Sequence, residues 1–399
     1  MRQGTFQVEA ITEVPALETL VPEWEHLAQQ NGGDVFFLRP AWFLSWIAHI
    51  QPEAKPLVLT IRRAGSLVAL LPLCLAPSRF GFRAVGFGGS DLVCGEYLGA
   101  LCDSEQRPKA MQAAFNWLAS AEPRWDILRL NAVAAHDELT ADLQQWSSTC
   151  QFSFLKLPES VCPYIELPKS FDEYLGTLGG RRRKHFLRAL RRLDEHGIQI
   201  KQYTACDEVH EAIDGLVRLH TLRWQSLGVA GTLGRPGYRE FLHAVAKRET
   251  SNSPFRLYVI EDAGNPVAAM LNFHSGHTAL QYQSGFDPHS RVACYSPGTI
   301  LVLLGIKAAI HERLSQYDFL RGAEQYKFQF ATQCRRTESV LVGRTILGRS
   351  YVLARNVRTH LGRLKRKGLS AQILENEPST VPSQQARRLA ILKPGLDSQ

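Results

Sequence analysis

The chain has 399 residues, of which 45% are hydrophobic and 21% charged, and its formal net charge is +8. This length predicts two or three domains of roughly 100 to 200 residues, and the composition excludes a chain that is disordered throughout. The segment from Arg344 to Gln399 contains eleven Lys and Arg and three Asp and Glu. It therefore carries the whole excess of eight, so the net charge does not indicate a basic body that binds nucleic acid.

The cysteines and the apolar runs indicate the compartment. Eight cysteines are dispersed without any C-x-x-C pair, which predicts reduced core residues and no bound metal. The N-terminal twenty residues contain no apolar block of signal-peptide length. The most apolar run, Leu67 to Ala76, is shorter than the roughly 20 residues needed to cross a bilayer. We expect a cytoplasmic protein, with peripheral contact to the inner membrane as a further option.

Two passages of the chain repeat one pattern of predicted elements. In each passage a helical stretch precedes a strand, a tight turn and a second strand, and then a further strand and a helix. The first passage has its turn at Ala64-Gly65-Ser66 and the second at Ala263-Gly264-Asn265. The predicted elements are, in the first passage, 38–50, 56–63, 67–76, 82–89 and 105–120, and in the second 207–227, 236–248, 254–262, 266–274, 278–286 and 298–313. The repeat predicts two similar units that each combine helices and strands.

Prolines mark the predicted boundary between these units. Pro158, Pro163 and Pro168 are expected to break regular structure near residue 160. We therefore predict an N-terminal domain over 1–160, a C-terminal domain over 161–348 and a basic tail over 349–399. The last strand is expected to end near residue 347, and a basic, helix-compatible segment follows to about residue 368.

A basic helix is predicted before Gly197. Seven of the twelve residues from Arg181 to Arg192 are Lys or Arg, and apolar residues recur among them at helical spacing. Arg182 and Arg183 are candidates for contacts with an anion. The pattern leaves open a solvated helix face, a phosphate-bearing substrate and a nucleic acid.

Two further segments could contain a site. Ser296 and Pro297 are typical of a helix start, where Gly298 and Thr299 would present free backbone N–H groups that can hold a phosphate. Polar residues also gather after a short predicted strand that carries Asp318, in the segment YDFLRGAEQYKFQF over 317–330. These residues could form a site or could be ion pairs that fasten a turn. No P-loop, serine-hydrolase elbow or zincin motif is present.

These segments together resemble a known family. Ser296-Pro297-Gly298, Asp318-Phe319, Arg321-Gly322 and Tyr326-Lys327 are similar to the closing part of the GNAT-like domain in the CelD/BcsL family, which are acetyltransferases associated with cellulose and exopolysaccharide biosynthesis. The Arg-rich helix and the N-terminal segments LRPAWFLSWI, LVALLPL and VGFGGSDL resemble it too. The family is distantly similar to FemAB-type aminoacyl transferases, which contain two GNAT-like domains.

The resemblance implies a mixed α/β and α+β fold with two tandem GNAT-like domains, each a mixed sheet flanked by helices. It implies transfer of an acyl group from acetyl-CoA or another acyl-CoA to an amine or hydroxyl. The acyl carbonyl would lie against the strand Leu280 to Gly285. The pyrophosphate would meet the helix start at Gly298.

Acyl transfer requires a base for the acceptor's proton and a donor for the oxyanion. Asp318 is the candidate base, Tyr282 would donate to the leaving sulfur or orient the acceptor, and Lys327 would bind an anionic group. The expected cofactor-binding residues are Gln283, Ser296, Gly298 and Thr299. The expected substrate-binding residues are Arg182, Arg183, Arg223, Arg321, Glu324 and Tyr326.

The leading hypothesis is an acyltransferase that acts on a small-molecule sugar nucleotide, a polysaccharide or a lipid-linked envelope precursor. One alternative is transfer of an aminoacyl group from tRNA, whose phosphates the Arg-rich helix would contact. Another is a non-catalytic module of a polysaccharide synthesis complex, in which the basic tail binds an anionic membrane surface or the synthase. The N-terminal domain lacks the Asp-Phe and Tyr-Lys runs, and we expect it to shape the substrate groove without a site of its own.

Overall fold

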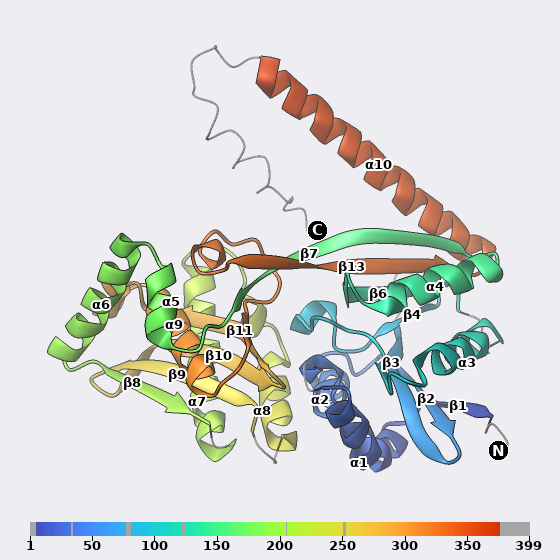
Figure 1. Ribbon diagram of the computed structural model, residues 1–399, viewed down its shortest axis with the longest axis horizontal. Coiled ribbons are helices and arrows are strands. Elements are labelled where there is room, and N and C mark those ends of the chain that lie inside the picture. Colours follow the sequence, from blue (N-terminus) through green and yellow to red (C-terminus); the bar gives the residue numbers. More distant parts are fainter. Residues whose placement is uncertain are drawn as a thin grey trace.

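The computed structural model describes residues 5–32, 35–76, 81–120, 125–204, 206–249 and 253–375. Figure 1 shows its two halves side by side, with β7 and β13 crossing from one to the other. The strands are β1 Phe6–Ile11, β2 Lys55–Arg63, β3 Ser66–Ala76, β4 Ala84–Phe87, β5 Leu101–Cys102, β6 Ile127–Ala134, β7 Ser153–Glu166, β8 Gln199–Tyr203, β9 Phe255–Asp262, β10 Asn265–Ser275, β11 Thr278–Phe286, β12 Gln316–Asp318 and β13 Gln333–Gly343. The helices are α1 Val14–Gln30, α2 Pro40–His49, α3 Arg107–Ser120, α4 Glu138–Thr149, α5 Phe171–Thr177, α6 Gly180–Glu195, α7 Cys206–Gln225, α8 Tyr238–Arg248, α9 Pro297–His311 and α10 Ile346–Glu375.

The two halves repeat one sheet topology. The order is β1-β2-β3-β4-β6-β13 in the N-terminal half and β8-β9-β10-β11-β12-β7 in the C-terminal half, and β13 pairs with β7 to join them into one sheet. In each half an antiparallel hairpin leads to a third strand, which pairs in parallel with the strand after the next helix. The predicted fold class is confirmed: the chain has two tandem mixed α/β units.

The predicted hairpin turns explain why each half begins in the same way. Ala64 and Gly65 between β2 and β3, and Ala263 and Gly264 between β9 and β10, all have positive φ. Two successive residues with positive φ give a turn whose twist matches that of the flanking strands. Both Ala-Gly pairs lie at the positions predicted from the sequence.

The strands β7 and β13 are exchanged between the halves. β7 follows the N-terminal elements along the chain, but its last residues pair with β12 of the C-terminal half. β13 follows the C-terminal elements and returns to pair with β6 of the N-terminal half. Pro158 and Pro163 lie inside β7, so the prediction that they break regular structure was wrong. β13 also ends at Gly343, and residues 346–347, predicted as strand, begin α10 instead.

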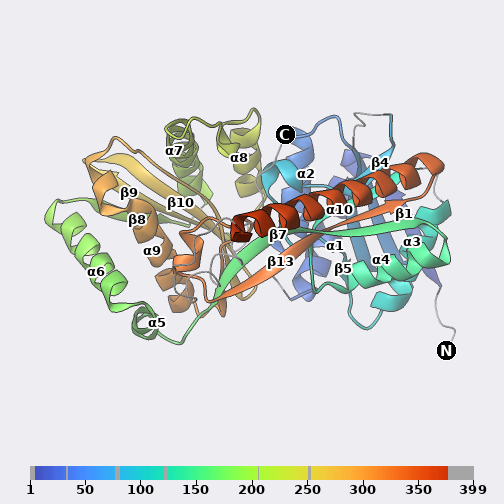
Figure 2. The same cartoon turned by 90° about the horizontal axis from the view of Figure 1, so that it is seen from above.

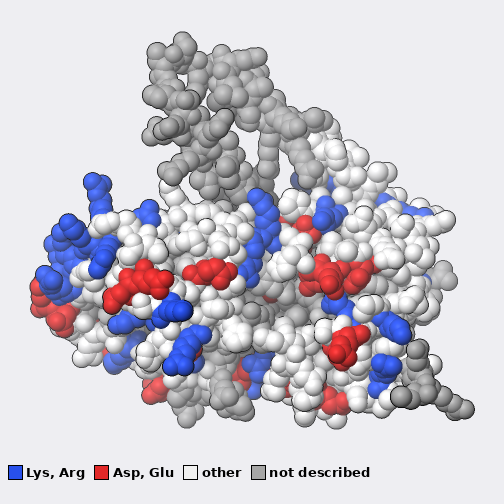
Figure 3. All heavy atoms as spheres, viewed as in Figure 1, with Lys and Arg blue, Asp and Glu red and all other residues white. Residues whose placement is uncertain are grey.

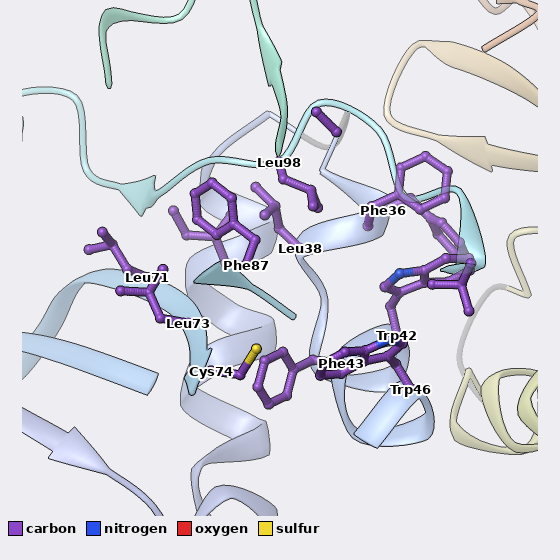
Figure 4. Close-up of a cluster of buried hydrophobic side chains, with 14 of the residues drawn as sticks. Phe36, Leu38, Trp42, Phe43, Trp46, Leu71, Leu73, Cys74, Phe87 and Leu98 are labelled. Atoms are coloured by element: carbon purple, nitrogen blue, oxygen red, sulfur yellow. The ribbon is translucent and has the colours of Figure 1, made fainter. Parts of the chain in front are cut away.

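Aromatic side chains fill the junction between the halves. Phe36 of the N-terminal half stacks on Phe273 of β10 with ring centroids 4.1 Å apart, and Trp42 of α2 lies edge-on to Phe241 of α8 at 4.8 Å. Figure 4 shows Phe36 and Trp42 beside Phe43 and the other labelled core side chains. Because these contacts belong to one continuous core, the two halves are held in a fixed relation.

The helix α10 leaves the body after β13. Gly348 and Val352 near its start are buried against the sheet, and the ring of Tyr351 lies 5.3 Å from that of Phe82. Further along, the helix rises away from the sheet (Figure 1). Within the described residues, no helix has the length and apolar character that crossing a bilayer requires. Of the predicted tail over 349–399, residues 376–399 lie outside the described part of the chain.

Candidate active site

A cavity of about 800 Å³ lies where β11 and β12 separate. The two parallel strands pair only from Thr278 and Gln316 to Leu280 and Asp318. Beyond that point β11 continues to Phe286 while the chain after β12 turns away. Backbone groups on this edge of β11 lose their strand partner, which leaves them able to bind a ligand.

The cavity is lined by both halves of the protein and by most of the predicted site residues. Cys94 comes from the N-terminal half and Ser160 from β7, which fits the expected groove-shaping role of the N-terminal half. The predicted residues that line it are Arg223, Tyr282, Gln283, Ser296, Gly298, Thr299, Arg321, Glu324, Tyr326 and Lys327. Arg182, Arg183 and Asp318 are not among the lining residues.

The start of α9 opens into this cavity. Ser296 precedes the helix with a left-handed φ of 57°, and its side chain makes no capping hydrogen bond. Thr299 N–H bonds back to the Ser296 carbonyl at 2.9 Å. A Cβ added at Gly298 would meet nothing within 4 Å, so the helix start is bare. The positive end of the helix dipole and the N–H of Gly298 make this a place for an anion, whereas the Thr299 N–H, which was predicted to be free, is occupied by the Ser296 carbonyl.

Arg223 adds a positive side chain to the same cavity. It comes from the last turn of α7, and its guanidinium lies 4.8 Å from the centre of the Phe286 ring. The other two cations that line the cavity in the described part of the chain are already paired. Arg321 forms an ion pair with the buried Glu96, and Lys327 lies 3.0 Å from the Glu324 carboxylate. Arg223 is therefore the cation best able to meet a ligand's negative charge.

Lys327 and Arg321 fasten the turn after β12. The Nζ of Lys327 donates to the Arg321 carbonyl at 2.5 Å, and the Lys327 side chain is almost fully buried. The Nη2 of Arg321 donates to the Gly95 carbonyl of the N-terminal half at 3.1 Å. The proposed capture of an anionic substrate group by Lys327 thus loses support, because its ammonium is occupied within the protein.

Asp318 is sealed behind the cavity. Its side chain is completely buried, and its carboxylate accepts hydrogen bonds from the Tyr97 hydroxyl at 2.8 Å and the Leu320 N–H at 2.7 Å. Burial raises the pKa of Asp318, although Arg335 acts in the opposite direction. The bond to Leu320 holds that residue at a φ of 53°, which aims the following residues at the cavity. This placement argues against Asp318 as the base and makes it a positioning residue.

Tyr282 is also committed to the protein. Its hydroxyl donates to the Val93 carbonyl of the N-terminal half at 2.7 Å and shares a second hydrogen bond with the hydroxyl of Tyr238. Burial raises the pKa of Tyr282 well above its usual value. The ring borders the cavity, but the hydroxyl predicted to serve the leaving sulfur fastens β11 to the N-terminal half instead.

The other polar residues are arranged along β11. Gln281 donates to the Tyr326 hydroxyl at 3.3 Å and accepts from the buried Tyr317 hydroxyl at 3.2 Å. Gln283 hydrogen-bonds the buried His220 of α7, whose pKa burial lowers to about 4. His220 is therefore neutral near pH 7, and its imidazole becomes charged only at acidic pH.

The basic helix lies outside the cavity. Arg182 and Arg183 are exposed on α6, and Arg182 donates to the Gln329 carbonyl at 2.6 Å. Figure 3 shows the concentration of Lys and Arg at the end of the molecule where Figure 1 places α6. The two arginines predicted to bind substrate are thus part of a separate basic surface.

The N-terminal half was expected to shape the groove, but none of its residues at the site was predicted individually. Gly95, Glu96 and Tyr97 hold Arg321 and Asp318, and Cys94 lines the cavity. All four follow the glycine-rich segment after β4, which was excluded as a P-loop and given in VGFGGSDL as part of the family resemblance, with no site residue predicted there. Its glycine density after a strand was the available signal, because such segments let the backbone approach another element closely.

Comparisons with known proteins agree with the observed fold. Residues 180–328 match the sequence profile of the acetyltransferase (GNAT) domain family. Among solved structures, FemX superposes with a TM-score of 0.60 at 11% identity, covering 84% of this chain and 96% of FemX. The C-terminal domain (DUF2156) of an Agrobacterium fabrum protein assigned as a lysylphosphatidylglycerol synthetase gives 0.52 at 10% identity, covering 86% and 97%. A search among curated proteins found no relative.

The C-terminal half thus contains a GNAT acetyltransferase domain, and the chain as a whole has a fold shared with FemX. The GNAT domain implies an acyl-CoA co-substrate. The finer assignment to the CelD/BcsL family remains a prediction.

Proposed function

We propose that the protein transfers an acyl group from a CoA thioester to an amine or hydroxyl acceptor in the cavity between β11 and β12. The observation that carries this proposal is the convergence on one cavity of a bare helix start at Gly298, an open strand edge, and Arg223, for which the described residues provide no ion-pair partner. The residues fit the donor. The pyrophosphate would lie against the start of α9, Arg223 would meet a phosphate, and the thioester carbonyl would receive hydrogen bonds from the β11 backbone.

The chemistry then follows from Glu324, the one carboxylate that lines the cavity among the residues that the structure describes. Glu324 is half exposed, and Lys327 holds it in place at 3.0 Å. The acceptor's lone pair attacks the thioester carbon, the C–S bond breaks as the tetrahedral oxyanion collapses, and the acceptor's proton passes to Glu324. The thiolate leaves and takes a proton from the same carboxyl group, which restores the carboxylate.

The acceptor class follows from the cavity and from the resemblance noted above. The opening between two half-domains suits an acceptor that is larger than a free amino acid, such as a sugar nucleotide, a polysaccharide end or a lipid-linked envelope precursor. Alternatively, the exposed basic surface on α6 favours a donor carried on tRNA, since its arginines can contact phosphates without entering the cavity.

Thermal unfolding with acetyl-CoA, CoA and desulfo-CoA tests the donor. A ligand at about 100 times its dissociation constant adds roughly 2.7 kcal/mol, which raises the melting temperature by several degrees. Arg223→Gln is expected to reduce this rise. If millimolar acetyl-CoA leaves the melting temperature of the intact protein unchanged, while charged tRNA raises it, the donor is an aminoacyl-tRNA instead.

A further inference from the structure

We propose that α10 lies in the plane of a membrane interface and binds bilayers that contain anionic lipids. The observation is an apolar ridge formed by Leu353, Val357 and Leu361, whose exposed fractions are 63%, 49% and 54%. The spacing of four residues places these side chains along one line of the helix. A row of exposed aliphatic side chains on a single helix is unfavourable in water, so this row has a partner.

Within the part of the chain that the structure describes, the body of the protein does not cover the ridge. α10 contacts the sheet through its other side, where Gly348 and Val352 are buried and Tyr351 packs on Phe82. Figure 2, viewed from above, shows the helix in front of β7 and β13 with its outer face uncovered by other labelled elements. The helix therefore has two apolar sides, and the second is available for an external surface.

The charge of the segment identifies that surface. Arg349, Arg355 and Arg358 are exposed on α10, and the sequence continues with Arg363 and the run Lys365-Arg366-Lys367. From Arg344 onward the sequence contains eleven Lys and Arg and only three Asp and Glu. A second copy of the chain would bring these like charges together, whereas anionic headgroups complement them. Each Lys or Arg near such a surface contributes about 1 kcal/mol.

The helix would lie on the bilayer and would not cross it. Within the described residues no helix is long and apolar enough to span, and cations alternate with the apolar residues along α10. An apolar row flanked by Lys and Arg is the pattern of helices that insert their apolar side at the boundary between headgroups and acyl chains. This inference goes beyond the proposed function and does not depend on the acyl donor or acceptor.

The test is co-sedimentation of the full-length protein with vesicles of phosphatidylcholine alone and of phosphatidylcholine mixed with phosphatidylglycerol. We expect binding to the mixed vesicles. The variant Leu353→Ser/Val357→Ser/Leu361→Ser is expected to lose about tenfold or more in vesicle affinity, because it removes the apolar contact. Arg355→Gln/Arg358→Gln is expected to lose about fivefold per arginine.

Matched controls separate this surface from general basicity. Arg188→Gln/Arg191→Gln makes the same charge change on the exposed face of α6, and it is expected to leave vesicle binding unchanged. Thermal unfolding of the ridge variant should match that of the wild type, since the three side chains are exposed.

Three results would overturn the proposal. The wild type could stay in the supernatant with mixed vesicles, or the ridge variant could sediment as well as the wild type. Sedimentation velocity could also show a dimer that the ridge variant converts to a monomer, in the absence of vesicle binding. That last result would assign the ridge to an interface between copies of the chain.

Discussion

The two halves share a topology, yet they differ at the helix that follows the third strand of each hairpin unit. In the C-terminal half α9 begins bare at Gly298, beside a cavity. In the N-terminal half the corresponding helix α3 begins at Arg107, whose guanidinium is paired with Asp137, Glu138 and Asp142. The start of α9 can therefore bind an anion, whereas the start of α3 is surrounded by carboxylates.

The two halves also differ at the place where their parallel strands separate, which is open in the C-terminal half and filled in the N-terminal half. The parallel pairing of β4 with β6 ends at Gly86 and Arg129, and the chain then packs tightly against α2. A Cβ at Gly88 would lie 2.3 Å from the Phe43 ring, and one at Gly89 would lie 2.6 Å from that of Trp42. The N-terminal half keeps a groove of about 400 Å³ with several aromatic and aliphatic lining residues. The shared fold therefore determines where a site can form in each half. The short segments that follow the strands determine whether that position is an open cavity or is filled by side chains.

The proposed chemistry lies in the C-terminal cavity, so removing the carboxylate of that cavity should have the largest effect. We expect Glu324→Gln to lower kcat by about 10²- to 10⁴-fold, which is the usual contribution of a general base. The measurement is single-turnover acyl transfer once an acceptor is identified, with donor binding checked by thermal shift. Asp318→Asn is the matched variant, because Asn can still accept from Leu320 N–H, and it should keep kcat within about tenfold. The opposite ranking of the two variants would restore Asp318 as the base.

A second change tests the junction that holds the halves together. Glu249, after α8, lies 2.7 Å from Arg39 at the start of α2. Burial raises the pKa of Glu249 to about 7 from its usual 4.5, and Arg39 only partly offsets this. The folded state therefore binds a proton that the unfolded state has released between these pH values. The contribution of Glu249 to the free energy of unfolding is therefore fully present below pH 4.5. It falls by about 3 kcal/mol as the pH rises to 7.

Urea unfolding across this pH range measures the effect. We expect Glu249→Gln to flatten the pH dependence and to exceed the wild type in stability above pH 7. The control is Glu240→Gln on the exposed side of α8, the helix that precedes Glu249, and it should leave the slope unchanged. A wild-type stability that rises between pH 4.5 and 7 would show that the Arg39 pair outweighs burial.

Local patterns in the sequence predicted much of this fold. The two Ala-Gly turns, the strand 278–286 and the helix start at Ser296 all lie where their short-range signals placed them. The exchange of β7 and β13 was not predicted, since strand pairing between distant segments leaves no local period. The prolines misled for a related reason: Pro163 lies in β7 with its carbonyl accepting from Phe319 N–H, so its missing donor did not end the strand.

The candidate site likewise has features that local sequence patterns predicted and features that they did not. The residue types near Gly298 and Glu324 were recognisable because capped helix starts and polar turns have local signals. The sealing of Asp318 was not, because its partner Tyr97 lies 221 residues away in the chain. Likewise, the hydroxyl of Tyr282 bonds Val93 across the junction between the halves. Sequence patterns thus located the cavity, whereas the roles of individual side chains depended on contacts between halves.

A third prediction compares the two helix starts directly. Arg223→Gln is expected to lower acyl-CoA affinity by about 10- to 100-fold, because a charge-assisted hydrogen bond to a phosphate contributes roughly 1.5 to 3 kcal/mol. Arg107→Gln should leave that affinity unchanged and lower the melting temperature, since it leaves three carboxylates without their cation. Isothermal titration with CoA and a thermal melt of each variant measure both quantities. Equal loss of affinity in the two variants would place a second donor site in the N-terminal half.

The smallest expected effect comes from adding a methyl group at a glycine in each half, one beside the open cavity and one in the packed segment after β4. Gly298→Ala adds a methyl group where no atom lies within 4 Å. Alanine also favours a helix over glycine by up to about 1 kcal/mol, so the melting temperature should hold or rise slightly. The same change at Gly88 forces a methyl group into the Phe43 ring and should cost about 1 to 3 kcal/mol. If acyl-CoA lies against the start of α9, Gly298→Ala weakens its binding a few-fold without loss of stability. A methyl group at Gly298 that leaves CoA affinity intact would move the pyrophosphate away from this helix.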